Sequence, residues 1–360
     1  MSDVVTFEHF VDEPVVARPR RGMRATLERH GLAWGLALLA VGGVGLVWSL
    51  EVMTASDGLV KYALAAASLV FLYIGLDLAT SAAFGARFDL GLWLSVTWMV
   101  AIIGGAVLAG VLPLAESKNV SKALLEPINQ RPDLFSSHPL GTDGQGLDIL
   151  GGILYGARVS LTIGVGAVLI GVAVGMMAGV TAGHRRGKVD GVVSFLTDSM
   201  LAFPPLVFLL AVVAAFSPTI LTVMLALAVL AIPTFIRLSR ANTLVFAQRE
   251  FVLAARALGE RDRSIVWREL VPNVALPVAS FGFLLVAAFI VAEASLSFLG
   301  LSVARPNPTW GNMIAAGQED FQTEPHVVFV PGTVLFLTVF TLNRIGEDAR
   351  RRWDPREAKV

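Results

Sequence analysis

Three acidic side chains within long apolar stretches are the first candidates for chemistry in this sequence: Asp77, Asp198 and Glu293. An ionisable group in such a stretch is costly in a membrane unless it reaches water or a partner, and each of the three lies near an end of its stretch. A carrier coupled to protons or sodium ions places such groups near the middle of the membrane, beside broken helices. The sequence does not indicate that arrangement, which disfavours an ion-coupled carrier.

Catalysis and metal binding have little support in the sequence. The absence of cysteine excludes disulfides, thiolate metal sites and cysteine nucleophiles. The five histidines are scattered without the spacing of metal ligands. The closest approach to a phosphate-binding loop, Gly183 to Lys188, has the wrong spacing and is followed by Val189. We therefore expect a chain that is not an enzyme and holds no cofactor or metal of its own.

The composition predicts an all-α polytopic membrane protein. Hydrophobic residues make up 55% of the 360 residues, charged residues only 16%, and the mean hydropathy is +0.70. Apolar runs long enough to cross about 30 Å of hydrocarbon predict about eight transmembrane helices. These runs are Leu32 to Leu50, Leu59 to Thr80, Leu90 to Leu114, Leu161 to Ala182, Val192 to Phe216, Ile220 to Ile236, Val274 to Phe298 and Val327 to Leu342.

The basic residues predict which side each loop faces. With the N-terminus in the cytoplasm, 22 of the 28 lysines and arginines lie on the inner side, as the positive-inside rule requires. An even number of spans then places the C-terminus in the cytoplasm as well. An alternative is that the first run is a cleaved signal peptide, although about 30 polar residues precede it. The parity of the spans does not exclude this alternative.

A charged loop between two apolar runs, residues 237–273, predicts a docking element; we call it the docking loop. Its helix formers end at Gly259, the residue type that most easily closes a helix with a left-handed turn. Asp262 is predicted to cap a second short helix and Pro272 to end it. A helix, a turn and a helix on one membrane face are suited to being held by another protein. An ordinary solvated basic loop would have a similar charge, so both interpretations stay open.

Two further loops are predicted on the outer side. Within the segment from Ala115 to Ser160, Gly141, Gly144 and Gly146 around Thr142 and Asp143 predict tight turns with Asx-type side-chain hydrogen bonds. The alternative is an ordinary surface turn that leads into an amphipathic helix. The second loop, Gly300 to Pro325, holds three prolines, of which Pro306 and Pro308 lie close to Trp310 and Gly311. They predict a stiff connector with the indole at the level of the lipid headgroups.

Several motifs together resemble one transporter family. They are HPLGTDGQGLDIL with the later YGARVSLTIG, then VLAARALG with its later VPN, and finally ASLSFLGL with PNPTWGNMI. In this order they resemble the C-type permease subunit of dipeptide and oligopeptide ABC importers, over about residues 83 to 356. The family carries Glu-Ala-Ala, a glycine and a later Leu-Pro, whereas this chain has Leu253 before its two alanines and Val271 before Pro272. Glu250, one helical turn before Leu253, offers a carboxylate on a similar face.

The resemblance implies a type I permease core whose ATP and Mg are bound by separate ATPase subunits. The ATPase-docking residues would be Glu250, Ala254, Ala255, Arg256, Gly259, Asp262 and Pro272. Expected partners are a B-type permease in a heterodimer, two ATPase subunits, an extracytoplasmic solute-binding protein and membrane lipid, and no nucleic acid. The expected location is the bacterial cytoplasmic (inner) membrane. The carried solute is left open, because relatives carry peptides, nickel chelates, glutathione-like molecules and opines.

The resemblance also predicts the domain organisation. The family usually has one span before its GTD loop and this chain has three, so two N-terminal spans are an addition that preserves the orientation of the core. The expected parts are a cytoplasmic tail (1–31), a two-span hairpin (32–82), the family's first span with the outer loop (83–160), the permease core (161–345) and a cytoplasmic tail (346–360). The hairpin glycines Gly35, Gly42, Gly43 and Gly45 favour close helix packing. The rival classes are an ion-coupled secondary transporter and a non-transporting scaffold.

Overall fold

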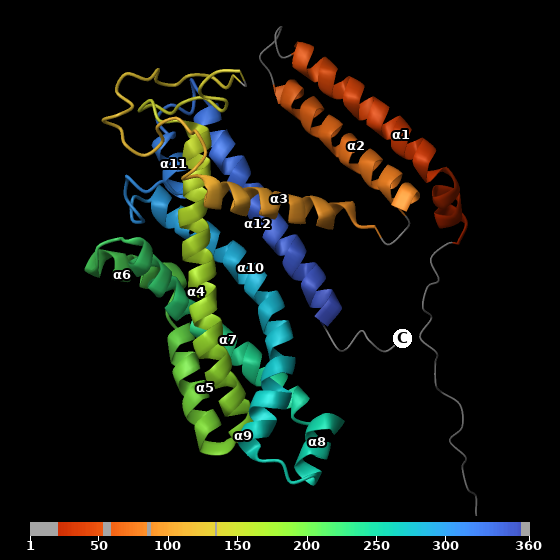
Figure 1. The fold of residues 1–360 in the computed structure, drawn as a ribbon, viewed down its shortest axis with the longest axis vertical. Coiled ribbons are helices and arrows are strands. Elements are labelled where there is room, and N and C mark those ends of the chain that lie inside the picture. Colours follow the sequence, from red (N-terminus) through yellow and green to blue (C-terminus); the bar gives the residue numbers. More distant parts are fainter. Residues whose placement is uncertain (1–20, 53–58, 85–87, 134, 354–360) are drawn as a thin grey trace, which may run out of the picture. The chain divides into compact units, whose positions relative to one another are not determined.

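A computed structural model describes residues 21–52, 59–84, 88–133 and 135–353 (Figure 1). Within these residues the regular structure is helical, apart from one isolated bridge between Thr142 and Asp148. The predicted all-α class is therefore confirmed. The chain divides into two compact units, Met1–Gly91 and Leu92–Val360. Each unit is described by itself below.

The first unit contains a helical hairpin of α1 (Arg21–Val52) and α2 (Leu59–Phe84). The two helices approach closely at glycines: a Cβ atom added to Gly35 would lie 2.8 Å from the backbone nitrogen of Ala79, and one added to Gly42 would lie 2.8 Å from that of Leu72. Larger residues would force the helices apart. Close packing is thus confirmed at Gly35 and Gly42, whereas a Cβ on Gly43 meets no described atom within 4 Å.

The second unit contains the remaining helices. The longer ones are α3 (Leu90–Leu108, whose first turn crosses the unit boundary), α4 (Ile149–Arg185), α5 (Gly187–Leu201), α6 (Pro205–Ala215), α7 (Ile220–Phe246), α10 (Val271–Phe298) and α12 (His326–Trp353). The shorter ones are α8 (Glu250–Ala257), α9 (Asp262–Ser264), a π-helical segment (Ile265–Leu270) and α11 (Trp310–Ala316). In Figure 1, α8 and α9 lie at one end of this unit, and α11 with the segment before α4 lies at the other.

A row of glycines on α4 sets the contact between α4 and α7. The row repeats every four residues and therefore lies on one face of the helix: it consists of Gly171, Gly175, Gly179 and Gly183. A Cβ on Gly175 would lie 2.6 Å from the Cβ of Phe235, and one on Gly183 would lie 2.9 Å from the Cβ of Thr243. The two helices are in direct backbone contact along this row, which holds α7 rigidly against α4.

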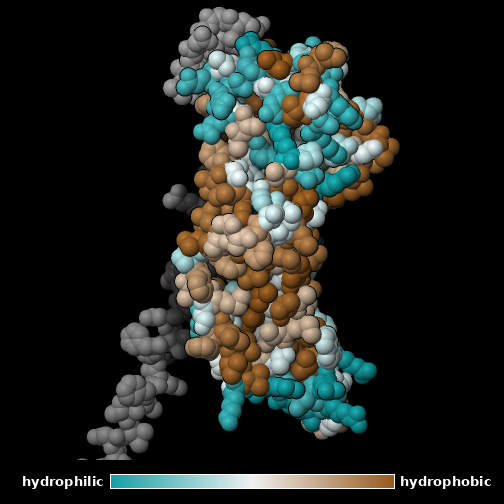
Figure 2. All heavy atoms as spheres, turned by 90° about the vertical axis from the view of Figure 1, so that its left-hand side faces the viewer, coloured by the Kyte–Doolittle hydropathy of each residue, from teal (hydrophilic) through white to brown (hydrophobic). Residues whose placement is uncertain are grey.

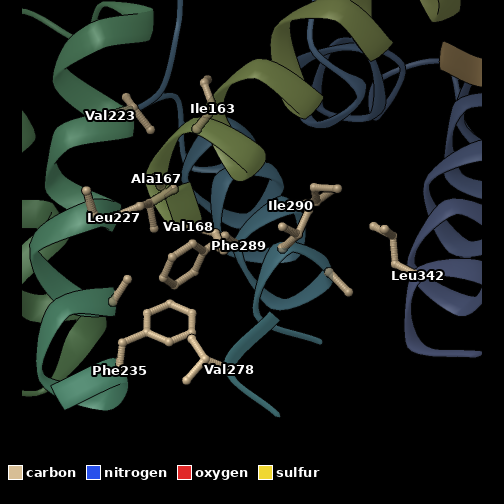
Figure 3. Packing of buried hydrophobic residues seen from close by; sticks show 14 of the residues in the cluster. Ile163, Ala167, Val168, Val223, Leu227, Phe235, Val278, Phe289, Ile290 and Leu342 are labelled. Atoms are coloured by element: carbon tan, nitrogen blue, oxygen red, sulfur yellow. The ribbon is translucent and has the colours of Figure 1, made fainter. Parts of the chain in front are cut away.

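The core of the unit lies between α4, α7 and α10, with α12 on the far side of α10 (Figure 3). Phe235 of α7 points toward Val278 and Phe289 of α10, and Ile163 of α4 lies above them. These side chains are fully or almost fully buried. Since they come from helices far apart in the sequence, their packing fixes the helix bundle that positions both ends of the unit.

The surface of the second unit matches a protein embedded in a membrane. Figure 2 shows a continuous hydrophobic band between two hydrophilic ends. Among the described residues, five helices are long and apolar enough to span a membrane, and the pair α5 and α6 makes a sixth if it counts as one span. The hairpin has shorter apolar stretches, Leu32–Val47 and Ala67–Ala83. The total of eight spans stays a prediction.

The fifth predicted span, Val192 to Phe216, is not a continuous helix. α5 ends at Leu201, α6 begins at Pro205, and the two are bent by 79°. Pro204 and Pro205 have no backbone N–H to continue the helical hydrogen bonds, and Pro204 has an extended conformation with ψ 125°. The apolar run that predicts one span is therefore two helices joined at a break, and the two prolines are the reason.

Candidate functional site

The first half of the docking loop comprises the last turns of α7 and then α8, which lies at the end of the bundle (Figure 1). One side of α8 faces the protein, with Val252 fully buried and Ala255 nearly so. Glu250, Ala254 and Arg256 are exposed on the other side. Of the predicted docking residues on α8, Ala255 therefore anchors the helix, while the other three are available to a partner.

Gly259 ends α8 in the left-handed conformation, as predicted, with φ 78°. Its N–H donates to the carbonyl of Arg256, and the N–H of Glu260 donates to the carbonyl of Ala255, both at 3.0 Å. This pair of hydrogen bonds is the Schellman motif, which satisfies the last carbonyls of a helix. The turn is thus built into the backbone, and the residue that permits it is exposed.

Two predictions about the second half of the docking loop were wrong. Asp262 does not cap α9, because Arg261 is the N-cap residue and no side-chain capping bond is formed; the Asp262 carboxylate instead lies 3.5 Å from Nε2 of His184. Pro272 does not end a helix, because the helical path runs from Asp262 to Phe298 without a break. Pro272 lies in the first turn of α10, where its missing N–H matters least.

An open groove of about 410 Å³ lies between the end of α4 and α8. It is lined by His184, Arg186, Ala247, Gln248, Leu253 and Arg256. Leu253 offers an exposed apolar surface, and the nearby Leu258 is 88% exposed. An apolar centre with arginines beside it is typical of a surface that binds a protein segment carrying acidic residues.

In the outer loop, Thr142 is a fully buried anchor. Its hydroxyl donates to the carbonyl of Pro127 at 2.5 Å and accepts from the N–H of Gln130 at 2.9 Å. Gly141 beside it has φ 84°, a conformation that favours glycine. These contacts tie two parts of the loop together.

Asp143 shapes the next turn through the predicted Asx-type bonds. Its Oδ1 accepts from the N–H groups of Gln145 and Leu147, both at 2.9 Å, and its Oδ2 lies 3.0 Å from Nη2 of Arg305. Gly144 is exposed, and a Cβ there would meet the carboxylate of Asp320. The Asp143 carboxylate therefore joins the two outer loops.

The Trp310 indole is not exposed to lipid headgroups, contrary to the prediction. It is fully buried, and its Nε1 donates to the carbonyl of Ile153 at 3.1 Å. Gly311 follows with close backbone packing, since a Cβ there would lie 2.8 Å from the carbonyl oxygen of Ala294. The second outer loop thus folds inward onto α4 and α10.

Glu293 is 1% exposed, so of the two predicted alternatives, interfacial water or partners, the structure shows partners. Its carboxylate accepts hydrogen bonds from Ser297 (2.8 Å), Ser302 (3.0 Å) and Ser160 (3.2 Å). These hydroxyls come from α10, from the loop after it and from α4. The buried carboxylate therefore links three segments near the outer end.

His138 is a feature that the sequence reasoning missed. It is 1% exposed, with Nδ1 3.2 Å from Oδ1 of Asp148 and Nε2 3.2 Å from Oε2 of Glu126. Its place directly before the predicted turn was the available signal. With a carboxylate at each ring nitrogen, the imidazole connects the start of α4 to the outer loop.

The other two acidic residues of the apolar runs are placed differently. Asp77 lies on α2 in the first unit and is partly exposed. Asp198 of α5 is exposed and pairs with Arg237 of α7, with Oδ1 2.6 Å from Nη2. No group of three or more side chains suited to holding a metal ion occurs among the residues that the structure describes.

A family model described as "Binding-protein-dependent transport system inner membrane component" matches residues 171–356. The protein named "Glutathione transport system permease protein GsiD" from Pectobacterium atrosepticum is 37% identical over 229 residues, which are 64% of this chain and 75% of that protein. The protein of the same name from Escherichia coli is 38% identical over the same lengths. An inward-facing structure of the MetNI methionine ABC transporter resembles this chain with a TM-score of 0.47 and 18% identity, over 56% of this chain and 96% of that one.

Proposed function

Because the chain belongs to the family of binding-protein-dependent transport system inner membrane components, we propose that it is the C-type permease of an importer of short peptides. As an ABC permease subunit it is not an enzyme, since ATP hydrolysis resides in separate subunits of such importers. Glutathione, a tripeptide, is the first solute to test, because the relatives with 37% and 38% identity are named as glutathione permeases.

The docking loop is the observation that carries this proposal. An exposed helix face, a left-handed turn at Gly259 and a groove of about 410 Å³ lie together at one end of the bundle. We assign this end to the cytoplasm and to the ATPase subunits, which would bind ATP and Mg. Glu250, Ala254, Arg256 and Gly259 would contact the ATPase, while the buried Ala255 would hold α8 in place. Asp262 and Pro272 would support the second half of the loop.

The opposite end is assigned to the extracytoplasmic solute-binding protein. Gly141, Thr142, Asp143 and Gly144 would shape the first outer loop, and Trp310 with Gly311 would hold the second against the bundle. The contact between Asp143 and Arg305 supports this role, since it joins both loops in one surface. In this arrangement both chain ends lie in the cytoplasm, a B-type permease completes a heterodimer, and the hairpin of residues 32–82 is a peripheral addition.

Reconstitution tests the proposal. The chain would be purified with its partner permease and ATPase subunits and placed in proteoliposomes. ATP would be supplied on the side of the ATPase subunits, and the binding protein with radiolabelled glutathione on the other side. We expect uptake that requires both ATP and the binding protein. Uptake that follows a proton or sodium gradient without ATP would instead show an ion-coupled carrier. A complex that assembles and hydrolyses ATP but moves no peptide would refute the proposed solute class.

A further inference from the structure

An exposed ion pair lies on the seam between α5 and α7. Oδ1 of Asp198 is 2.6 Å from Nη2 of Arg237, and the two side chains are 64% and 60% exposed. Neither charge is therefore covered by the described part of this chain. Exposed apolar side chains surround them on α5, among them Phe195 and Leu201.

The pair lies away from the inner ends of its helices, and Asp198 is thus deeper than its place near the end of an apolar run predicted. Asp198 follows Gly187, the first residue of α5, by eleven positions, and Arg237 precedes Phe246, the last residue of α7, by nine. At 1.5 Å per residue these distances are about 16 Å and 14 Å. Basic residues at the turn between α4 and α5 mark the membrane surface on this side. An ion pair at this depth is costly against lipid tails and requires water or a polar partner.

The interruption of the helix between α5 and α6 is a second, independent indication of water in this region. Residues 201–207 are all exposed, and they include the break between α5 and α6. Pro205 has no N–H to donate to the carbonyl of Leu201, its acceptor in a continuous helix. Non-helical backbone at membrane depth is tolerated where it is buried in protein or lines a water-filled cavity. This break begins only a few residues after Asp198, so the non-helical backbone and the exposed charges lie in one region.

A second ion pair on the same seam provides a contrast. Asp190 and Arg240 form two hydrogen bonds, the second at 2.7 Å, and their side chains are 20% and 35% exposed. This pair lies nearer the helix ends and is partly shielded, as expected of a contact that braces α5 against α7. The Asp198 pair is exposed and is formed through one guanidinium nitrogen. Its two charges therefore remain able to bind other groups.

We propose that Asp198 and Arg237 line the water-filled solute path and offer an anion and a cation to a solute that carries both charges. The inference rests on the proposed importer function and specifies its solute as a zwitterion, such as a free peptide. A carboxylate binds the ammonium group of such a solute, and a guanidinium binds its carboxylate with two parallel hydrogen bonds. The pair is mutually neutralised when the path holds no solute.

Thiol labelling tests whether this region holds water, and the lack of native cysteine makes the result clear. Thr234→Cys places a thiol on α7 one turn farther from the inner end than Arg237. Val174→Cys on α4 is the matched control, since Val174 is 48% exposed and the neighbouring Gly175 packs against Phe235 at this depth. Lys188→Cys reports full access. A charged, membrane-impermeant methanethiosulfonate would be added to inside-out vesicles that hold the assembled transporter, without nucleotide and with ATP plus vanadate.

We expect the labelling rate of Thr234→Cys to lie within about tenfold of that of Lys188→Cys in at least one state. Val174→Cys should react about a hundredfold more slowly than Lys188→Cys, because a thiol without water rarely ionises. Equally slow labelling of Thr234→Cys and Val174→Cys in both states would overturn the proposal and place lipid or the partner permease over the pair. The labelling experiment needs no solute, so its result does not depend on whether the proposed function is correct.

Charge neutralisation tests the contact with the solute. Asp198→Asn and Arg237→Gln should each slow glutathione uptake per assembled complex by about tenfold, since each loses a charge-assisted hydrogen bond. Asp190→Asn is the control, and it should lower the amount of complex while leaving uptake per complex unchanged. Unchanged uptake per complex in both Asp198→Asn and Arg237→Gln would overturn the solute contact, provided the unaltered transporter carries glutathione.

Discussion

A valine in place of Gly259 tests the docking loop at its left-handed turn. Gly259 has φ 78°, and an added Cβ meets no described atom within 4 Å. The substitution therefore creates no clash, and its cost is that of a left-handed conformation in an L-residue, about 1–2 kcal/mol. Such a cost reduces the population of the correct turn by a factor of about 5 to 30. Binding of the ATPase subunits should weaken by the same factor if they require this turn.

The assay is a titration of purified ATPase subunits onto the permease pair in detergent, together with uptake in cells. Gly259→Asn is the matched variant, because asparagine tolerates the left-handed conformation better than valine and should retain most of the affinity. Gly332→Val controls for added bulk, since a Cβ at this helical glycine also meets no described atom within 4 Å. Membrane insertion should be unaffected in all three, because apolar length and flanking charge decide it. Normal affinity and normal uptake in Gly259→Val would refute the reasoning and place the docking surface elsewhere.

Four further outcomes are expected. A chain that begins after residue 82 should still insert with reporters at Thr142 and Gly187 on the same opposite sides of the membrane as in the full chain, and an inverted pair would contradict the even number of added spans. Asp143→Ala should lower uptake by weakening the outer loops without changing solute preference, as competition between peptides would show. Glu293→Ala should destabilise the purified permease by about 1–3 kcal/mol or more in thermal unfolding, because three buried serine hydroxyls lose their acceptor. An unchanged melting temperature would mean that these hydrogen bonds do not stabilise the fold. Gly175→Val should cost about 1–3 kcal/mol by forcing α4 away from α7, with the same measurement as the check.

The features that the sequence alone determined are those that depend on neighbouring residues. Apolar length and flanking charge predicted the helices, and the all-α class was confirmed. The turn at Gly259 and the Asx bonds of Asp143 were also predicted correctly, since each involves hydrogen bonds within a few positions of the chain. Local conformational preference and local hydrogen bonding are sufficient for such features.

The tertiary structure alone decided how distant side chains meet. The partner of the Trp310 indole is 157 positions away, the Ser160 hydroxyl on Glu293 is 133 positions away, and Arg237 is 39 positions from Asp198. Residue type showed that each group needed a partner, but burial and pairing depend on how the helices pack. The same reason explains why Ala255 faces inward while Ala254 remains exposed. A helix turns its side chains by a known angle, but only its neighbours decide which side is covered.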